Sequence, residues 1–171
     1  MTASVGWVSA LRGGYRPHVA RTPAIAVLEQ EGVAYRLLEY ELDPRAESYG
    51  LEAAEKLGVE PERVFKTLVV AADGAHVFAV LPVAARLDPK AVGKRAHVAD
   101  PADAERITGY VKGGTSVLGG RKRLLVLLDE SALGHETIVL NAGRRGLQME
   151  LAPDDLLRLT GGRTTALAAK R

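Results

Sequence analysis

The sequence predicts a single domain of the mixed α/β or α+β class, because hairpin signals and helix signals alternate along its 171 residues. Asp73-Gly74 separates two apolar runs, which is typical of a β-hairpin. Asp100 precedes Pro101, a typical helix start, because aspartate caps free backbone N–H groups and proline suits the first turn. This mixture favours a mixed sheet of about five to seven strands with helices around it over a doubly wound parallel sheet.

Apolar periodicity, caps and turn residues predict the other elements. Thr22 with Pro23 is typical of a helix start, and Gly32 and Gly58 are typical of helix ends. In chain order we expect a helix (22–32), a strand (34–42), a helix (48–58), two hairpin strands (63–70 and 75–82), two short helices (88–95 and 100–109), a strand (124–130), a second hairpin (136–151) and a last helix (152–162).

The distribution of charge and the absence of a linker indicate one domain that is flanked by two terminal segments. The net charge is +2, but residues 1–21 hold three arginines and no acid, and the remainder holds 20 basic and 21 acidic residues. A uniformly basic nucleic-acid-binding protein is therefore not indicated. We expect 1–21 to be a basic extension, 22–162 to be the domain and 163–171 to be a C-terminal tail.

Composition excludes several classes of function. The chain has no cysteine, which excludes disulfides, zinc–thiolate sites and a cysteine nucleophile. Its four histidines lack the spacing of metal ligands, so we expect no metal and no other cofactor. No apolar run approaches the roughly 18 residues of a membrane span, and the N-terminus lacks the apolar core of a signal peptide. We therefore expect a cytoplasmic protein that does not contact membranes.

Lys66 is unexpected in the apolar segment RVFKTLVV, residues 63–70. Strand alternation puts Lys66 on one face with Leu68 and Val70, while Thr67 points to the other face. Two interpretations are open: a lysine at a sheet edge that extends to water, or a lysine at the floor of a pocket that meets an anionic or carbonyl group. The hairpin partner favours an interior strand and hence the second interpretation.

The glycine-rich segment GYVKGGTSVLGG (109–120) fits none of the phosphate-loop or nucleophile motifs tested. Gly114 and Gly119 have P-loop spacing, but Gly120 stands where lysine is required. A G-x-S-x-G elbow starting at Gly114 fails at Leu118. Two interpretations remain: a loop whose backbone N–H groups bind an anion or oxyanion, or a plain connection between a helix and a strand.

Taken together in this order, four segments resemble the YbaK family: TPAIAVLEQEGVAYRLLEYELD, EAAEKLGVEPERVFKTLVV, ITGYVKGGTSVLGGRKR and ETIVLNAGRRGLQMELAPDDLL. The family comprises aminoacyl-tRNA deacylases related to the editing domain of bacterial prolyl-tRNA synthetases. The resemblance implies one compact domain with a curved, barrel-like sheet. It also implies hydrolysis of the ester of a mischarged tRNA, most typically Cys-tRNA(Pro), with the tRNA end and a synthetase such as prolyl-tRNA synthetase as partners.

The resemblance also implies which residues form the site. Lys66 matches the functional lysine of the family, and the family's glycine loop covers 113–119, with Gly113, Gly114, Thr115 and Ser116 as catalytic-loop residues and Val117 and Gly119 as substrate-binding residues. Tyr40 falls on a pocket position, although its residue pattern alone predicts a half-buried core aromatic. Asp155 falls at the site edge, although a first-turn acid is also expected from the helix dipole alone.

Val117 departs from the family pattern, in which proline usually follows the loop serine. Proline would fix its own φ and restrict the preceding residue, so Val117 restores an N–H and loosens Ser116. This departure leaves an alternative open: a catalytically weak or inactive member of the family that only binds a tRNA or a synthetase.

Overall fold

The computed structural model describes residues 7–8 and 21–170, with side chains described for 21–170. Its helices are α1 (Pro23–Glu31), α2 (Tyr49–Leu57), α3 (Pro101–Thr108) and α4 (Pro153–Thr160), and its strands are β1 (Trp7–Val8), β2 (Tyr35–Glu39), β3 (Phe65–Ala72), β4 (Ala75–Pro82), β5 (His97–Val98), β6 (Leu125–Asp129), β7 (Ile138–Arg144), β8 (Leu147–Leu151) and β9 (Arg163–Thr165). Short 3-10 turns lie at η1 (Pro61–Arg63), η2 (Pro89–Ala91) and η3 (Glu130–Gly134).

The helices begin and end where the caps predict. The Thr22 and Ser48 side chains accept hydrogen bonds from the backbone N–H groups of Ile25 and Leu51, and the Asp100 side chain caps α3 through Ala102. The helix predicted over 88–95 is instead the single 3-10 turn η2. The predicted segment is short, so an α-helix there would form few backbone hydrogen bonds to offset the free-energy cost of nucleation.

The strands form two sheets, which confirms a mixed α/β domain but corrects the expected barrel-like sheet. One sheet has the order β1-β2-β8-β7 and is antiparallel, and the other has the order β5-β3-β4-β6-β9 and is mixed. The sheets meet at a single bridge between Val64 and Val139. One bridge supplies no continuous ladder, so the sheets do not close into a barrel.

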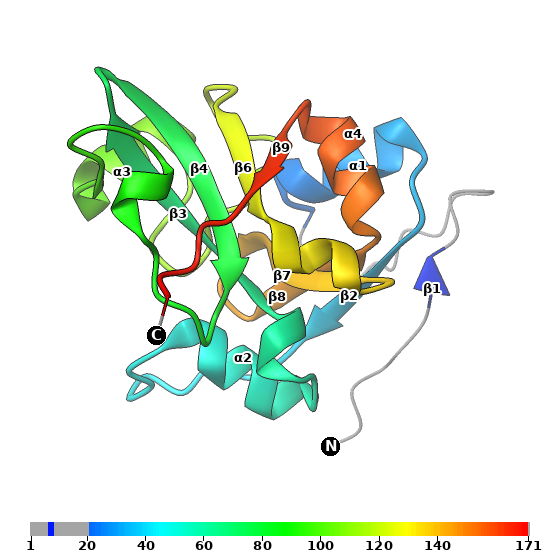
Figure 1. Ribbon diagram of the computed structural model, residues 1–171. Coiled ribbons are helices and arrows are strands. Elements are labelled where there is room, and N and C mark those ends of the chain that lie inside the picture. The colour runs from blue at the N-terminus through cyan, green and yellow to red at the C-terminus, as the bar shows by residue number, and fades with distance from the viewer. Residues whose placement is uncertain (1–6, 9–20, 171) are drawn as a thin grey trace.

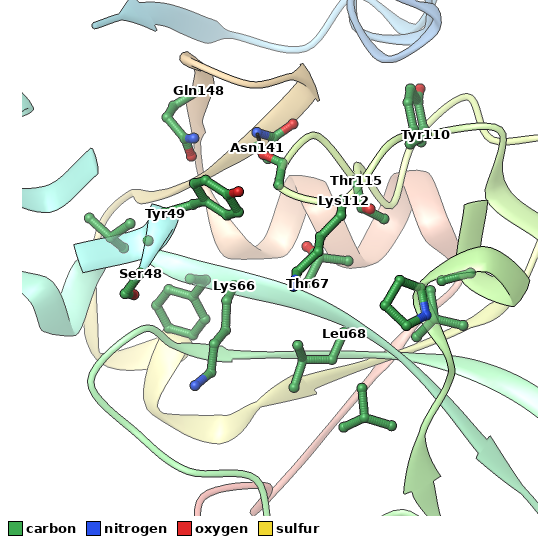
Figure 2. A pocket seen from close by; sticks show the side chains of 18 of the residues that line it. Ser48, Tyr49, Lys66, Thr67, Leu68, Tyr110, Lys112, Thr115, Asn141 and Gln148 are labelled. Atoms are coloured by element: carbon green, nitrogen blue, oxygen red, sulfur yellow. Dashed lines mark hydrogen bonds between the residues drawn. The ribbon is translucent and has the colours of Figure 1, made fainter. Parts of the chain in front are cut away.

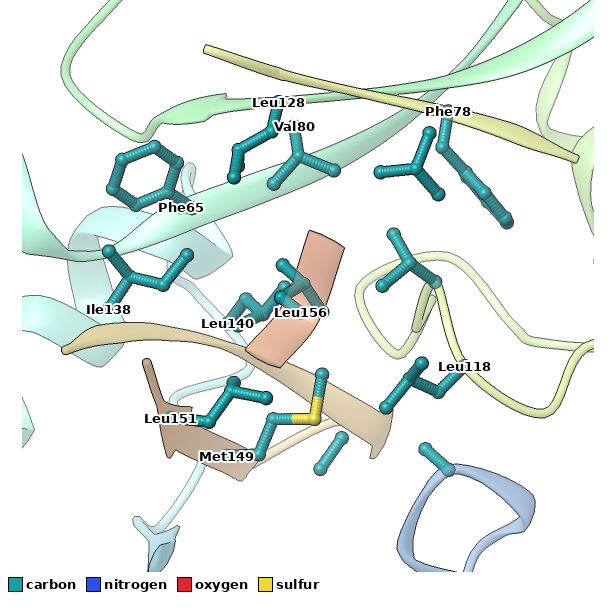
Figure 3. Close-up of a cluster of buried hydrophobic side chains, with 14 of the residues drawn as sticks. Phe65, Phe78, Val80, Leu118, Leu128, Ile138, Leu140, Met149, Leu151 and Leu156 are labelled. Carbon is teal, nitrogen blue, oxygen red and sulfur yellow. The ribbon is translucent and has the colours of Figure 1, made fainter. Parts of the chain in front are cut away.

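The main core fills the space between the two sheets, as Figure 3 shows. Phe65, Phe78 and Leu128 face it from the five-stranded sheet, and Leu140 and Met149 face it from the other. Each of these side chains is at most 2% exposed. Figure 1 shows α1 and α4 on the side of the molecule where β6 and β9 lie, with α2 at the other end.

The segment expected to be a C-terminal tail is part of the fold. Residues 163–165 form β9, which pairs in parallel with β6. Leu167 is fully buried, and its N–H and that of Ala168 donate to Oδ1 of Asp129 at 2.8 and 3.2 Å. At the other end, residues 7–8 pair with β2, and the rest of the predicted extension up to residue 20 lies outside the described residues.

A buried ion cluster fixes the start of β3. The Glu150 carboxylate accepts hydrogen bonds from Arg36 Nε at 2.7 Å, Arg63 Nη2 at 2.9 Å and Thr137 Oγ1 at 2.6 Å. Burial alone would raise the pKa of Glu150, but the Thr137 hydroxyl and the two guanidinium groups outweigh it and lower the pKa. Glu150 is thus a charged anchor, and it joins β2, η1 and β8 beneath the segment that leads to Lys66.

Candidate active site

A pocket of about 410 Å³ opens beside the first half of β3 (Figure 2). Its wall combines β3, the start of α2, the glycine-rich loop after α3 and the two strands β7 and β8. The lining residues that carry polar groups or charges used below are Tyr40, Tyr49, Lys66, Thr67, Lys112, Gly113, Thr115, Asn141 and Gln148. Clefts of this size, with mixed apolar and polar walls, are typical small-molecule sites.

Lys66 lies in this pocket wall and is half-buried. Its Nζ donates a hydrogen bond to the carbonyl oxygen of Ala85, at 2.6 Å, in the turn that follows β4. Burial lowers the pKa of the Lys66 ammonium. A cation that is partly desolvated and anchored by one neutral carbonyl is well suited to interact with a partial or full negative charge.

The backbone N–H and C=O groups of Thr67 lie at an edge of β3 that is not paired with another strand in the described part of the chain, and Thr67 lines the same pocket. The Val64 carbonyl accepts from Val83 on the β4 side, and the Val69 carbonyl accepts from Ala99 on the opposite side. Because N–H and C=O groups alternate sides along a strand, the backbone groups of Thr67 point away from β4, and β5 pairs with β3 only at Val70 and Ala71. The buried Thr67 hydroxyl also has no hydrogen-bond partner among the described residues. The edge therefore offers an unpaired backbone donor to a ligand.

The first two loop glycines allow the backbone to approach its neighbours closely. Gly113 has φ +83°, and a Cβ there would lie 2.9 Å from Cδ2 of Tyr49. A Cβ on Gly114 would lie 3.1 Å from the backbone nitrogen of Arg145. The Gly114 N–H donates to the Val111 carbonyl at 2.9 Å, whereas that of Gly113 has no acceptor among the described residues. Of these two N–H groups, only that of Gly113 is available to a ligand.

The loop then turns away from the pocket. Thr115 lines it, but Ser116 is fully buried and its Oγ accepts from the Leu118 N–H at 3.2 Å. Val117 is 9% exposed and packs into the main core. The Tyr110 hydroxyl donates to the Leu118 carbonyl at 2.7 Å, and burial raises the pKa of Tyr110 to about 12. Ser116 and Val117 thus shape the loop from behind and do not line the pocket.

Three other predicted site residues, Gly114, Gly119 and Asp155, also lie outside the pocket lining. Gly119 has φ +72°, and a Cβ there would be 2.6 Å from the Pro23 carbonyl oxygen, so this glycine serves packing against α1. Asp155, in the first turn of α4, pairs with Arg158 at 3.2 Å. Gly119 and Asp155 thus do not line this pocket, and their predicted contact with the substrate stays a prediction.

Tyr40 lines the pocket and has partners that the sequence reasoning missed. Its hydroxyl lies 3.5 Å from the Tyr49 carbonyl and also interacts with Gln148. Burial raises the pKa of Tyr40, which keeps its hydroxyl protonated as a donor. Asn141 Nδ2 donates to the Gly113 carbonyl at 3.0 Å and ties the loop to β7. The polar Gln148 within an apolar strand was the signal that could have identified the β8 wall.

Lys112 and Arg145 are two basic residues that the sequence did not single out. In Figure 2 the Lys112 side chain extends into the pocket. The guanidinium of Arg145 stacks over the Tyr49 ring, 5.0 Å from its centroid, and Arg145 Nε donates to the Lys112 carbonyl at 2.6 Å. Their position follows from contact between two segments far apart in sequence, which no local pattern encodes.

Among residues 21–170 no group of three or more His, Asp or Glu side chains is placed to hold a metal ion. Within the part of the chain that the structure describes, no helix is both long and apolar enough to span a bilayer.

Comparison with known proteins defines the class to which this pocket belongs. Residues 44–159 match the family described as "Aminoacyl-tRNA editing domain". The "Putative Cys-tRNA(Pro)/Cys-tRNA(Cys) deacylase EbsC" of Enterococcus faecalis is 36% identical over 157 residues, which cover 88% of this chain and 94% of that protein.

Solved structures share the fold. A "putative trans-editing enzyme for prolyl tRNA synthetase" superimposes with a TM-score of 0.77 at 25% identity, covering 89% of this chain and all of that one. A hypothetical protein superimposes with a TM-score of 0.77 at 23% identity, over 86% of this chain, and supports the fold alone.

The chain therefore belongs to the aminoacyl-tRNA editing family, the YbaK family. The family is one of aminoacyl-tRNA deacylases, so the protein is an ester hydrolase.

Proposed function

We propose that the protein hydrolyses the ester of mischarged aminoacyl-tRNA, and that Cys-tRNA(Pro) is its preferred substrate. The observation that carries this proposal is the pocket itself, in which Lys66, the open edge at Thr67 and the free N–H of Gly113 line one cavity. The 36% identical relative named for Cys-tRNA(Pro) and Cys-tRNA(Cys) supports cysteine as the amino acid.

The chemistry requires little from the protein beyond binding and charge stabilisation. An aminoacyl ester is already activated, so a nucleophile adds to its carbonyl carbon and the bond to the ribose oxygen then breaks. The cysteinyl thiol of the substrate can itself serve as that nucleophile: its proton passes to the departing ribose oxygen, and water then opens the thiolactone that forms. For other amino acids, water is the nucleophile. The chain has no cysteine, and among the residues that the structure describes no Ser-His-Asp arrangement lines the pocket.

The proposed roles follow from which groups remain available. The backbone N–H of Gly113 and of Thr67 would donate to the oxyanion that forms as the nucleophile adds. Lys66 would stabilise the same charge or the departing ribose oxygen, since burial leaves its ammonium few competing partners. Tyr40 and Gln148 would contact the aminoacyl group from the β2 and β8 side. Together these groups would bind the transition state more tightly than the ester.

The test is a deacylation panel with purified protein. Cys-tRNA(Pro), Ala-tRNA(Pro), Pro-tRNA(Pro) and Cys-tRNA(Cys) are incubated separately, and the remaining acylated tRNA is measured over time against a buffer blank. We expect the largest rate above the blank with Cys-tRNA(Pro). Rates equal to the blank for every tRNA would reject the proposed activity, and faster clearance of Ala-tRNA(Pro) would reject the cysteine preference.

A synthetase is the proposed helper in tRNA selection, because phosphate contacts normally carry affinity and residues 22–171 have no excess of basic residues. The same panel with added prolyl-tRNA synthetase tests this. We expect the synthetase to raise the rate for tRNA(Pro) and not for tRNA(Cys), and an equal effect on both tRNAs would contradict the proposal.

A further inference from the structure

We propose that Lys112, in the pocket lining, and Arg145, against the neighbouring Tyr49 ring, form an anion subsite that binds a phosphodiester of the single-stranded 3′ end of the tRNA. This inference rests on the proposed function and adds the way in which the nucleic acid is held. Neither residue was among the site residues predicted from the sequence.

Lys112 is a pocket cation with no counter-ion. Within residues 21–170 no carboxylate lies within 4.0 Å of its Nζ, and its backbone carbonyl, not its ammonium, is what Arg145 contacts. Figure 2 shows its side chain reaching into the cavity, whereas Lys66 is directed to the Ala85 carbonyl. The acids in the lining, Glu47 and Glu105, are exposed and pair with neither cation.

Arg145 is held in place by contacts that leave its terminal nitrogens available. Its Nε donates to the Lys112 carbonyl at 2.6 Å, and its guanidinium carbon lies over the Tyr49 ring. None of the described residues accepts a hydrogen bond from its two η nitrogens. An arginine already ordered by stacking loses little further entropy when its η nitrogens bind an oxyanion.

A phosphodiester fits this pair better than other anions because of where the pair lies. Single-stranded nucleic acid is typically held by cations along its backbone and aromatic rings beside its bases, and Tyr49 places such a ring between Arg145 and the cavity. The ester to be cleaved lies on the terminal ribose, whose 5′ oxygen carries the last phosphate. With the aminoacyl group at Lys66, Thr67 and Gly113, that phosphate would lie toward Lys112 and Tyr49, which line the same pocket.

The first experiment compares two esters that differ by a phosphodiester. Cysteinyl-adenosine has none, and the cysteinyl ester of the dinucleotide CpA has one; kcat/KM is measured for both with wild type, Lys112→Ala, Arg145→Gln and the control Lys122→Ala. Lys122 is exposed and lies outside the pocket lining. We expect wild type to prefer the CpA ester, and each site variant to lower the CpA-to-adenosine ratio of kcat/KM about tenfold, as befits one lost charge-assisted hydrogen bond. An unchanged ratio in both site variants would overturn the subsite.

The second experiment does not depend on catalysis. Binding of 5′-fluorescein-labelled CCA trinucleotide is followed by anisotropy at several KCl concentrations. For each lost contact we expect the slope of log K against log[KCl] to become shallower by about 0.7 in Lys112→Ala and Arg145→Gln, and to stay at the wild-type value in Lys122→Ala. Equal slopes in all four proteins would refute the subsite, even if no ester were hydrolysed. Conversely, shallower slopes without any hydrolysis would support the subsite and reject the deacylase proposal.

Discussion

Lys66 is anchored on the carbonyl oxygen of Ala85 at 2.6 Å and not on the glycine-rich loop across the pocket. The two walls of the pocket thus reach the substrate independently: the lysine through the turn after β4, the loop through its contacts with β7 and the turn before β8. Because burial lowers the pKa of Lys66, removal of its charge relieves a desolvation cost in the folded state. A substitution of Lys66 should therefore change activity much more than it changes the stability of the fold.

Lys66→Met should lower kcat/KM for Cys-tRNA(Pro) by at least about 100-fold, as expected when a stabiliser of transition-state charge is lost. The free energy of unfolding should change by no more than about 1 kcal/mol, because one hydrogen bond is lost while the methylene packing is retained. Urea denaturation supplies the second measurement. A large loss of stability with activity retained in the folded fraction would identify Lys66 as structural only.

Gly119→Ala should destabilise the fold by about 3 kcal/mol, because the site combines a left-handed φ with a contact to the backbone of Pro23. Gly58→Ala is the matched control: Gly58 has φ +64° and nothing within 4 Å of the added Cβ, so about 1 kcal/mol is expected. Thermal unfolding of both variants beside wild type measures the difference. Equal losses would show that conformational strain, and not close packing on α1, is what requires glycine at 119.

Val117→Pro should not raise the rate of deacylation above that of wild type. Val117 contributes to the main core and does not line the pocket, so proline there would alter packing without adding a catalytic group. Deacylation of Cys-tRNA(Pro) by the two proteins under matched conditions tests this. If wild type were inactive and the proline variant active, the alternative of a disabled family member that only binds tRNA or a synthetase would be supported.

Stability should fall in acid through Glu150. Its folded-state pKa lies below the ordinary value of 4.5, so its contribution is present above about pH 4.5 and is lost as pH falls through the folded-state pKa. Glu150→Gln should cost about 3 kcal/mol at pH 7, since Arg36 and Arg63 would lose their carboxylate. The gap in unfolding free energy between wild type and variant, measured by denaturation from pH 7 down to pH 3, should narrow with acid. A constant gap would contradict the role assigned to the carboxylate.

Local signals predicted the elements well because their causes are local. The caps at Thr22 and Asp100 act within one helical turn, and the Asp73-Gly74 turn joins adjacent strands. These features are confirmed. The barrel-like sheet that the family resemblance implied was wrong, because one bridge, between Val64 and Val139, is what joins the two sheets among the described residues. That contact links positions 75 apart, which no local pattern reports.

The pocket was only partly predictable for the same reason. Lys66 was recognisable because a charge in an apolar strand is costly unless it has a partner or a use. The direction in which each loop side chain points was not predictable, because a glycine-rich segment has no helical or strand periodicity that would assign its residues to a face. Ser116 and Val117 therefore turned out to face the core, while Lys112, next to the loop, faces the cavity. The catalytic and binding roles proposed for these residues remain predictions.

The hydrogen bonds between Asp129 and the C-terminal segment affect the order in which the parts of the five-stranded sheet can fold. Its carboxylate receives the N–H groups of Leu167 and Ala168, and β9 lies alongside β6 in parallel. A nascent chain can assemble the hairpin of β3 and β4 early, since those strands are neighbours in sequence. The outer edge of β6 stays uncovered until the ribosome has released residues near 168 from its exit tunnel. During translation that edge is the last part of the sheet to be protected from contact with other chains.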